Sequence, residues 1–206
     1  MSIHGMISAF LAQPLIFHWQ QKLCNNYGAV KEHFARYVDV SGKDVLDIGC
    51  SSGNCASALL PMGRNRYVGI DIVPGYIELA RKRHPAGSFL CMDARELTFR
   101  DNSFDLITLI AVLHHMSDEL INDCLKEVRR VLRADGIVLC AEPVFTKGRP
   151  LSNLLLTFDR GKYIRAREGY QSLFRGFDLS EVRYFDFSIH RCCSFILRRK
   201  ALANAA

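Results

Sequence analysis

Short apolar runs alternate with amphipathic stretches through the first two thirds of the chain. The apolar runs predict β-strands, and stretches with apolar side chains three or four positions apart predict helices. Strands are expected at 43–48, 66–71, 88–91, 104–110 and 137–142, and helices near 54–62, 74–84 and 117–132. Strands that alternate with helices favour right-handed crossovers and a parallel sheet. The pattern therefore predicts an α/β fold with a doubly wound, Rossmann-like sheet.

Two predicted helices show which of their faces should be buried. A helix at 28–38 places Val30, Phe34 and Tyr37 on one face. The helix near 117–132 has an apolar stripe of Leu120, Cys124, Val128 and Val131. Ser117 and Asp118 can cap its start, because Ser and Asp accept hydrogen bonds from the first free amides of a helix.

The alternation stops at both ends of the chain, although we expect a single domain over residues 1–206. Strands near 180–187 and 192–199 predict a closing pair. In chain order, the expected parts are a helical cap (1–38), a sheet core (43–142), an insertion (143–175) and a closing hairpin (176–200).

Three of the predicted strands lead into an aspartate. Asp47 precedes a turn with Gly49 and Gly53, Asp71 ends the second strand, and Asp93 follows the third. Pyrophosphate-binding turns avoid a negative charge at this place, so the ligand nearest Asp47 should be cationic or a hydrogen-bond donor. S-adenosylmethionine fits, because it carries an ammonium and a sulfonium. The second acid is placed to accept ribose hydroxyls, and the third can accept the adenine amino group.

From about residue 28 to 142 the chain resembles the class I S-adenosylmethionine-dependent methyltransferases, in particular the small type 11 group. The motifs that carry the resemblance lie at 47–53, 69–72, 93–94, 101–106, 112–115 and 130–136. The resemblance implies a seven-stranded, mostly parallel sheet with an antiparallel closing strand. It implies cofactor contacts from Asp47, Gly49, Ser51, Gly53, Asp71, Ile72, Asp93, Ala94 and Ile110. Ser51 stands where the family usually has Gly; we interpret this as tuning, because its hydroxyl can contact the ligand.

Three residues are candidates for catalysis. Methyl transfer from a sulfonium needs alignment, a dry site and, for some nucleophiles, a base. His114 and His115 follow the fourth strand, and Glu142 ends the fifth. His115 is the preferred base, since the pKa of histidine lies near neutral pH. The alternatives are that the pair packs at the start of the next helix and that Glu142 is a capping or salt-bridging carboxylate.

The insertion supplies candidates for substrate binding. Arg160, Lys162 and Arg165 can grip a carboxylate or phosphate, because guanidinium binds both in a bidentate manner. A solvated basic turn is the alternative reading of the same residues. Trp19 and Tyr27 are candidates for a lid over the cofactor, or for core packing within the cap.

The composition limits which binding partners we expect. The net charge is +6, and residues 144–206 carry twelve Lys or Arg against five Asp or Glu. This imbalance suits an anionic acceptor or a solvated basic face, and with no RNA-binding motif we expect no nucleic acid. Eight cysteines lack any Cys-x-x-Cys spacing, so we expect reduced thiols and no metal. The N-terminus has no basic start, which argues against a secretory signal and for a cytoplasmic protein without stable membrane insertion.

The sequence thus predicts methyl transfer from S-adenosylmethionine to a small-molecule acceptor, at oxygen or nitrogen. A second hypothesis keeps the cofactor but has it attacked elsewhere, as in a cyclase or lyase that releases methylthioadenosine. A third is a cofactor-binding module without catalysis. The sequence gives no prediction of oligomeric state.

Overall fold

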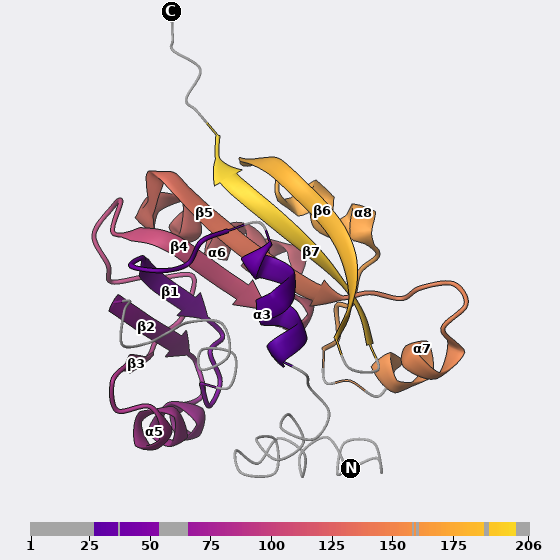
Figure 1. The fold of residues 1–206 in the computed structure, drawn as a ribbon, viewed down its shortest axis with the longest axis horizontal. Helices are drawn as coiled ribbons and strands as arrows, with labels where there is room; N and C mark the ends of the chain where they lie inside the picture. The colour runs from indigo at the N-terminus through magenta and orange to yellow at the C-terminus, as the bar shows by residue number, and fades with distance from the viewer. Residues whose placement is uncertain are drawn as a thin grey trace, which may run out of the picture.

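The computed structural model describes residues 27–36, 38–53, 66–157, 159, 161–187 and 190–200. Within these residues the chain forms one seven-stranded sheet, in the order β3-β2-β1-β4-β5-β7-β6 (Figure 1). The strands are β1 (Asp44–Ile48), β2 (Arg66–Asp71), β3 (Ser88–Cys91), β4 (Phe104–Ile110), β5 (Leu132–Pro143), β6 (Phe177–Phe187) and β7 (His190–Arg199). The helices are α3 (Tyr27–Ala35), α5 (Pro74–Arg83), α6 (Asp118–Val131), α7 (Pro150–Thr157) and α8 (Arg167–Leu173), with a short 3-10 helix η1 (Leu113–His115).

The pairing of the strands confirms the predicted fold. Strand β1 pairs in parallel with β2 and β4, and the parallel set extends to β3 on one side and β5 on the other. Strand β7 runs antiparallel to β5, and β6 antiparallel to β7. The chain winds one way from β1 to β3 and the other way from β4 onward. The carboxyl ends of β1 and β4 therefore form the switch point at which open α/β sheets bind ligands.

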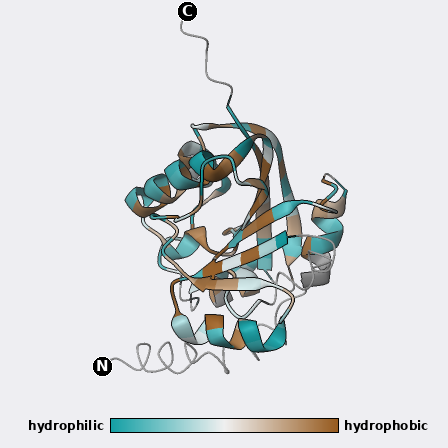
Figure 2. Cartoon of the chain, turned by 90° about the vertical axis from the view of Figure 1, so that its left-hand side faces the viewer, coloured by the Kyte–Doolittle hydropathy of each residue, from teal (hydrophilic) through white to brown (hydrophobic). Residues whose placement is uncertain are grey.

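The central strands are buried on both faces, which is why they read as apolar runs. Successive side chains of β1 enter opposite sides of the sheet. Leu46 and Ile48 pack in one core cluster with the buried face of α6, and Val45 packs in another with α3 and α5. Figure 2 shows hydrophobic residues along the strands and hydrophilic residues on the outer faces of the helices.

Helix α6 follows its prediction closely, with one shift of its buried face. Ser117 caps it by accepting a hydrogen bond from the Leu120 amide. Its buried residues are Ile121, Cys124, Leu125, Val128 and Val131. Leu120, expected in the stripe, is only partly buried and lines a cavity at the sheet edge.

The closing strands are longer than predicted, and part of the cap lies outside the described residues. Strand β5 begins at Leu132, directly after α6, because Leu132 already pairs with Phe104. Strand β6 begins at Phe177, and β7 extends back to His190. The helix expected at 54–62 and residues 1–26 lie outside the described residues, as does Tyr37 on the predicted face of α3.

Helices α7 and α8 occupy the insertion between β5 and β6. Helix α7 follows the carboxyl end of β5 and reaches beyond the sheet in Figure 1. In the part of the chain that the structure describes, the helices are too short or too polar to cross a bilayer.

Candidate functional site

A cavity of about 610 Å³ lies at the switch point of the sheet. Its walls come from the ends of β1, β2 and β4, from the turn after each of them, and from the segment after β3. The lining residues are Ile48, Gly49, Cys50, Ser51, Ile70, Asp71, Ile72, Val73, Tyr76, Met92, Asp93, Ala94, Arg95, Ile110, Ala111, Val112, His115, Met116 and Leu120.

The turn after β1 forms the floor of this cavity. The amides of Gly49 and Cys50 both donate to the Ile70 carbonyl, at 2.9 and 3.0 Å, which fixes the turn against β2. Gly49 has a φ of 72°, and a Cβ on it would lie 2.5 Å from Cγ2 of Val112. Glycine is required here both by conformation and by space.

Ser51 adopts a backbone conformation that suits glycine better. Its φ is 49°, in the left-handed region that residues with a Cβ rarely enter. The Ser51 amide donates to Oδ2 of Asp71 at 3.0 Å. Its hydroxyl oxygen is buried and has no hydrogen-bond partner among the residues that the structure describes. A buried polar atom of this kind at a cavity wall calls for a partner, which a ligand can supply.

Asp71 and Asp93 both lie on the cavity wall, as predicted. Asp71 accepts hydrogen bonds from the amides of Ser51 and Val73, at 3.0 and 2.9 Å. Asp93 is held by a fork of hydrogen bonds from Arg95, the shortest of 2.6 Å. These hydrogen bonds lower the pKa of Asp93, so it stays ionised. Arg95 therefore belongs to the site, although nothing in its spacing indicates this.

Asp47 is not on the cavity wall, so the prediction that it contacts the ligand ammonium directly is corrected. The side chain is 2% exposed and lies within the sheet. Its two oxygens accept hydrogen bonds from Tyr67 at 2.7 Å and from Thr108 at 2.6 Å. Burial, with a smaller contribution from the charge of Asp71, raises the pKa of Asp47 to about 6, although the two hydrogen bonds lower it.

Gly53 is also absent from the cavity wall. It has a φ of 77°, and a Cβ on it would come within 2.6 Å of Cδ2 of His84 at the end of α5. The need for glycine at this position comes from packing against α5. Its part in the site is to close the turn.

The comparisons with known proteins agree with this geometry. The type 11 methyltransferase family model, described as "Methyltransferase domain", matches residues 46–140. Residues 46–140, just under half of the chain, are therefore similar to this methyltransferase family.

Curated methyltransferases are similar to part of this chain. Phthiotriol/phenolphthiotriol dimycocerosates methyltransferase 1 of Mycobacterium ulcerans is 37% identical over 111 residues, which are 51% of this chain and 39% of the relative. Ubiquinone biosynthesis O-methyltransferase of Actinobacillus pleuropneumoniae is 30% identical over 133 residues, 60% of this chain and 53% of the relative. The chain spans about half the length of these curated relatives or less.

A solved structure extends the likeness in fold over nearly the whole chain. A chain from the complex of the Haloferax volcanii Trm112 methyltransferase activator with a methyltransferase superposes with a TM-score of 0.75. It is 19% identical, and the match covers 94% of this chain and 97% of that one. At this identity the likeness concerns the fold.

The rim of the cavity is built by η1 and the residues around it. Ile110 lines the cavity, as the resemblance implies, and is followed by Ala111, Val112, His115 and Met116. Ala111 has a φ of 55°, so the chain turns sharply as it leaves β4. The sequence alone does not identify these apolar rim residues, because hydrophobic side chains in a turn resemble core residues.

Glu142 does not reach this rim, which corrects its expected role toward substrate. The side chain is fully buried. One oxygen accepts hydrogen bonds from the amides of Val112 and Leu113, at 3.0 and 2.7 Å. The other accepts from the His114 amide at 3.2 Å and lies 2.7 Å from Nδ1 of the same residue. Glu142 is therefore the carboxylate that caps η1, as the alternative interpretation had it.

His114 and His115 have different surroundings although they are neighbours in sequence. His114 is 3% exposed, and its Nε2 lies 3.4 Å from Oδ1 of Asp159. Burial lowers the pKa of His114, but the hydrogen bonds with Asp159 and Glu142 outweigh it and raise the value to about 9. His115 is exposed at the cavity, with its ring centroid 4.0 Å from that of His114. Only His115 can face an acceptor.

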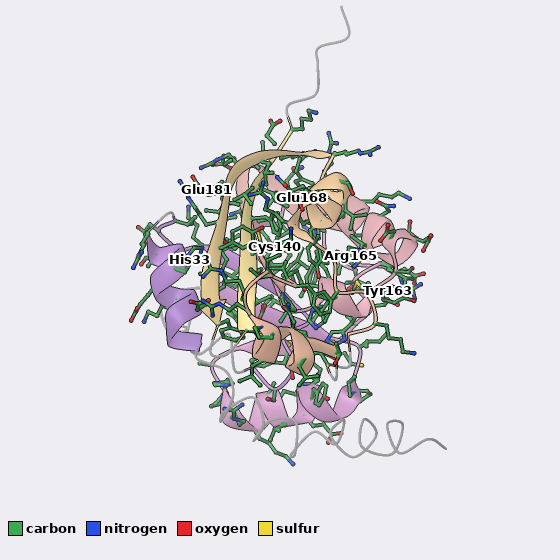
Figure 3. All side chains as sticks on the ribbon, turned by 90° about the vertical axis from the view of Figure 1, so that its right-hand side faces the viewer. His33, Cys140, Tyr163, Arg165, Glu168 and Glu181 are labelled. Carbon is green, nitrogen blue, oxygen red and sulfur yellow. The ribbon has the colours of Figure 1, made fainter. Side chains whose placement is uncertain are left out.

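Arg165 is not available to grip an anion, which corrects the prediction from its sequence. Its guanidinium donates to Oδ1 of Asp118 and to the carbonyls of Met116, Leu113 and Tyr163. The side chain is 13% exposed. Figure 3 shows Arg165 beside Tyr163, and the guanidinium carbon lies 5.7 Å from the centre of that ring. Arg165 joins the insertion to the rim.

The other predicted substrate contacts are placed only in part. Lys162 is exposed on the insertion. Arg160 and Trp19 lie outside the described residues, and so does the side chain of Tyr27 at the start of α3.

Proposed function

We propose that the protein transfers a methyl group from S-adenosylmethionine to an oxygen or nitrogen of a small-molecule acceptor, with a hydroxyl as the first choice. The observation that carries the proposal is the cavity at the switch point, with its glycine turn, the Asp71 carboxylate and the buried, unpartnered hydroxyl of Ser51. The relatives support it, because both are methyltransferases by name and one is an O-methyltransferase.

The cavity wall suggests how the cofactor would be held. The methionine part would lie on the turn at Gly49 and Ser51, and the ribose would bind the Asp71 carboxylate. Ile72, whose side chain is 65% exposed, offers an apolar surface beside that carboxylate. The adenine would reach Asp93 and Ala94, and Ile110 would complete the site.

Asp47 would act on the cofactor without contacting it. The cofactor's sulfonium and ammonium are positive, and a buried anion beneath the turn attracts a cation more strongly than an exposed one does, because the surroundings screen it less. Tyr67 and Thr108 hold the carboxylate in place.

The bound cofactor supplies a methyl group that is already activated by the sulfonium. The protein must align the acceptor with it and exclude water. The rim has an apolar surface that would exclude water, made by Val112, Met116 and Leu120. His115, next to them, is the candidate to receive the acceptor's proton.

An anionic acceptor would rest on Lys162 and Arg160, because Arg165 is engaged elsewhere. Added salt would then raise the Michaelis constant of the acceptor, since charge attraction at an exposed site is screened. Candidate acceptors include hydroxylated lipids and quinols, the chemistry that the relatives' names indicate.

Calorimetric titration of Asp71→Ala with S-adenosylmethionine tests the cofactor site. We expect binding weaker by about 2–4 kcal/mol, because ribose hydroxyls lose a charged acceptor and the Ser51 amide loses its anchor. Asp123→Ala is a matched control, since Asp123 lies on the outer face of α6 and pairs with Lys126. Wild-type affinity in a folded Asp71→Ala protein would remove the ribose assignment.

The reaction itself is identified by its product. Incubation with labelled cofactor and candidate acceptors should yield S-adenosylhomocysteine, measured by mass spectrometry. Methylthioadenosine in its place would indicate a cyclase or lyase. Absence of cofactor binding in calorimetry would favour a module without catalysis.

A further inference from the structure

Four polar side chains meet between η1 and the insertion, beside the cavity. His114 lies between Glu142 on one side and Asp159 on the other. The ring of His115 contacts that of His114 at a tilt of 42°, and one ligand atom each from His114, His115 and Asp159 lie within 4.8 Å of one another. Two imidazoles and a carboxylate are ligands that zinc and related divalent metals take.

The spacing of one pair of these atoms suits a tetrahedral ion. Zinc binds histidine nitrogen and carboxylate oxygen at about 2.0–2.2 Å, so two ligands of a tetrahedral site lie roughly 3.3–3.5 Å apart. The separation of Nε2 of His114 and Oδ1 of Asp159 is 3.4 Å. A metal at this place would replace the proton through which His114 bonds Asp159 in the metal-free protein.

The surroundings of His114 fix its ring in the orientation of a metal ligand. Its Nδ1 lies 2.7 Å from Glu142, which directs Nε2 toward Asp159. A carboxylate behind the ligating histidine is the usual support of such sites. Glu142 is itself held by the amides of Val112 and Leu113, so the support is rigid.

The insertion closes the cluster from the other side. The Gly161 amide donates to Oδ1 of Asp159 at 2.6 Å and orients that carboxylate. A side chain at Gly161 would overlap Cδ2 of His114, so glycine is needed for the insertion to lie against the ring. The Tyr163 amide donates to the His114 carbonyl at 3.0 Å and continues the contact.

We propose that His114, His115 and Asp159 form a binding site for one divalent transition metal, with zinc as the best fit, whose open position faces the cofactor cavity. This departs from the expectation of no metal, which rested on the lack of any Cys-x-x-Cys spacing. Three protein ligands and one open position are typical of catalytic zinc sites, whereas structural sites have four protein ligands.

The inference rests on the proposed function and adds that a metal ion would hold the acceptor. His115 lines the cavity, so the open position is next to the place of the transferred methyl group. A hydroxyl or carboxylate oxygen of the acceptor would occupy it, and the metal would lower the pKa of a bound hydroxyl. The metal-bound protein would then use His115 as a ligand and not as the base.

The test is metal binding by tag-free protein after treatment with a chelator. We expect calorimetry with zinc chloride to give one site per chain, and cobalt(II) to give the visible absorption bands of a tetrahedral ion. Asp159→Asn and His115→Gln should each weaken zinc binding by about 10- to 100-fold or more. Asp123→Asn is the matched control and should bind zinc as the parent does.

Both ligand variants change side chains exposed at the cluster's edge, so they should leave the fold intact, which circular dichroism checks. Less than one zinc per chain in the parent would overturn the inference. Equal zinc affinity in Asp159→Asn, His115→Gln and the parent would also overturn it, since the ion would then sit elsewhere.

Titration of the same samples with S-adenosylmethionine separates this inference from the proposed function. Cofactor binding without zinc binding would reject the metal site alone. Zinc binding without cofactor binding would reject the proposed function and leave the site.

Discussion

At the scale of single residues, the turn after β1 combines two unusual features. Ser51 has a left-handed backbone with a buried hydroxyl, and Asp47 is a buried carboxylate two residues before Gly49. Each is costly for folding, since left-handed backbone and buried charge both reduce stability. Residues that reduce stability are common where a ligand binds.

Ser51→Gly and Ser51→Ala separate the backbone of this residue from its hydroxyl. Ser51→Gly should raise the free energy of unfolding by about 1 kcal/mol or leave it unchanged, because glycine has no penalty at a φ of 49°. Its cofactor affinity should stay within about tenfold of the parent, or 1.4 kcal/mol. Ser51→Ala keeps the strain and loses the hydroxyl. Loss of cofactor binding in both variants would show that the hydroxyl is an essential contact.

The buried carboxylate of Asp47 predicts a dependence of stability on pH. Its pKa in the folded protein is about 6, above its ordinary value of 3.8. A raised pKa means that the folded state holds the proton more tightly than the unfolded state does. The resulting contribution of Asp47 to the free energy of unfolding is complete below pH 3.8 and is lost as pH rises through 6. From about pH 4 to 6.5 the loss should be on the order of 2–3 kcal/mol.

Urea unfolding of the parent and Asp47→Asn at pH 4.5 and 7.5 measures this contribution. The asparagine variant should gain stability relative to the parent at the higher pH. Other acids, such as Asp93 and Asp105, have lowered pKa values, so their contribution to stability grows as pH rises. They are present in both proteins, and the quantity to compare is therefore the difference in unfolding free energy between the parent and Asp47→Asn. A difference that does not change with pH would show that Asp47 is already ionised at pH 4.5.

At the scale of elements, the parallel strands and α6 could be predicted because local pattern determines them. Central strands need apolar residues on both faces, and a surface helix needs one apolar stripe. The insertion could not be predicted in the same way. Its contacts with η1 depend on Asp159, Gly161 and Arg165, which lie far along the chain from His114 and have no periodicity of their own.

Arg165→Ala tests whether this arginine is structural. It should reduce the free energy of unfolding by about 1–3 kcal/mol, because the carbonyls of Leu113 and Met116 and the carboxylate of Asp118 lose a donor. Arg165→Lys should recover little, since an ammonium cannot reproduce the fork of a guanidinium.

Chemical unfolding and the Michaelis constant of an acceptor distinguish the two roles of Arg165. An unchanged stability together with a raised Michaelis constant would restore the role of Arg165 as an anion contact. Lys162→Ala is the comparison, because Lys162 is exposed and its replacement should leave stability as it is.

At the scale of the whole molecule, the basic charge of the last third is partly used inside the fold. Arg149 and Arg191 both pair with Asp186, and Arg183 pairs with Glu181. The count of charges in the sequence could not show this, because Arg191 meets Asp186 only when β6 and β7 pair, and Arg149 reaches the same carboxylate from the insertion.

For a related reason, cavity residues at the ends of strands were easier to predict than residues that enter from loops. Asp71 and Asp93 follow strands whose ends must meet at one edge of the sheet, so the topology places them. Arg95 and Asp159 enter the site from loops, and the fork of Arg95 on Asp93 and the contact of Asp159 with His114 depend on loop conformation. A sequence pattern contains little information about either.

The fastening of the insertion to η1 has a consequence for protein engineering. Acceptor preference in a protein of this design could be exchanged by transplanting the segment between β5 and β6 from a relative. Such a chimera would keep its catalytic rim only if the donor segment brings an acid, a glycine and an arginine equivalent to Asp159, Gly161 and Arg165, or if η1 is exchanged with it. The segment and η1 are therefore one transferable unit, although helix α6 and strand β5 separate them in the chain.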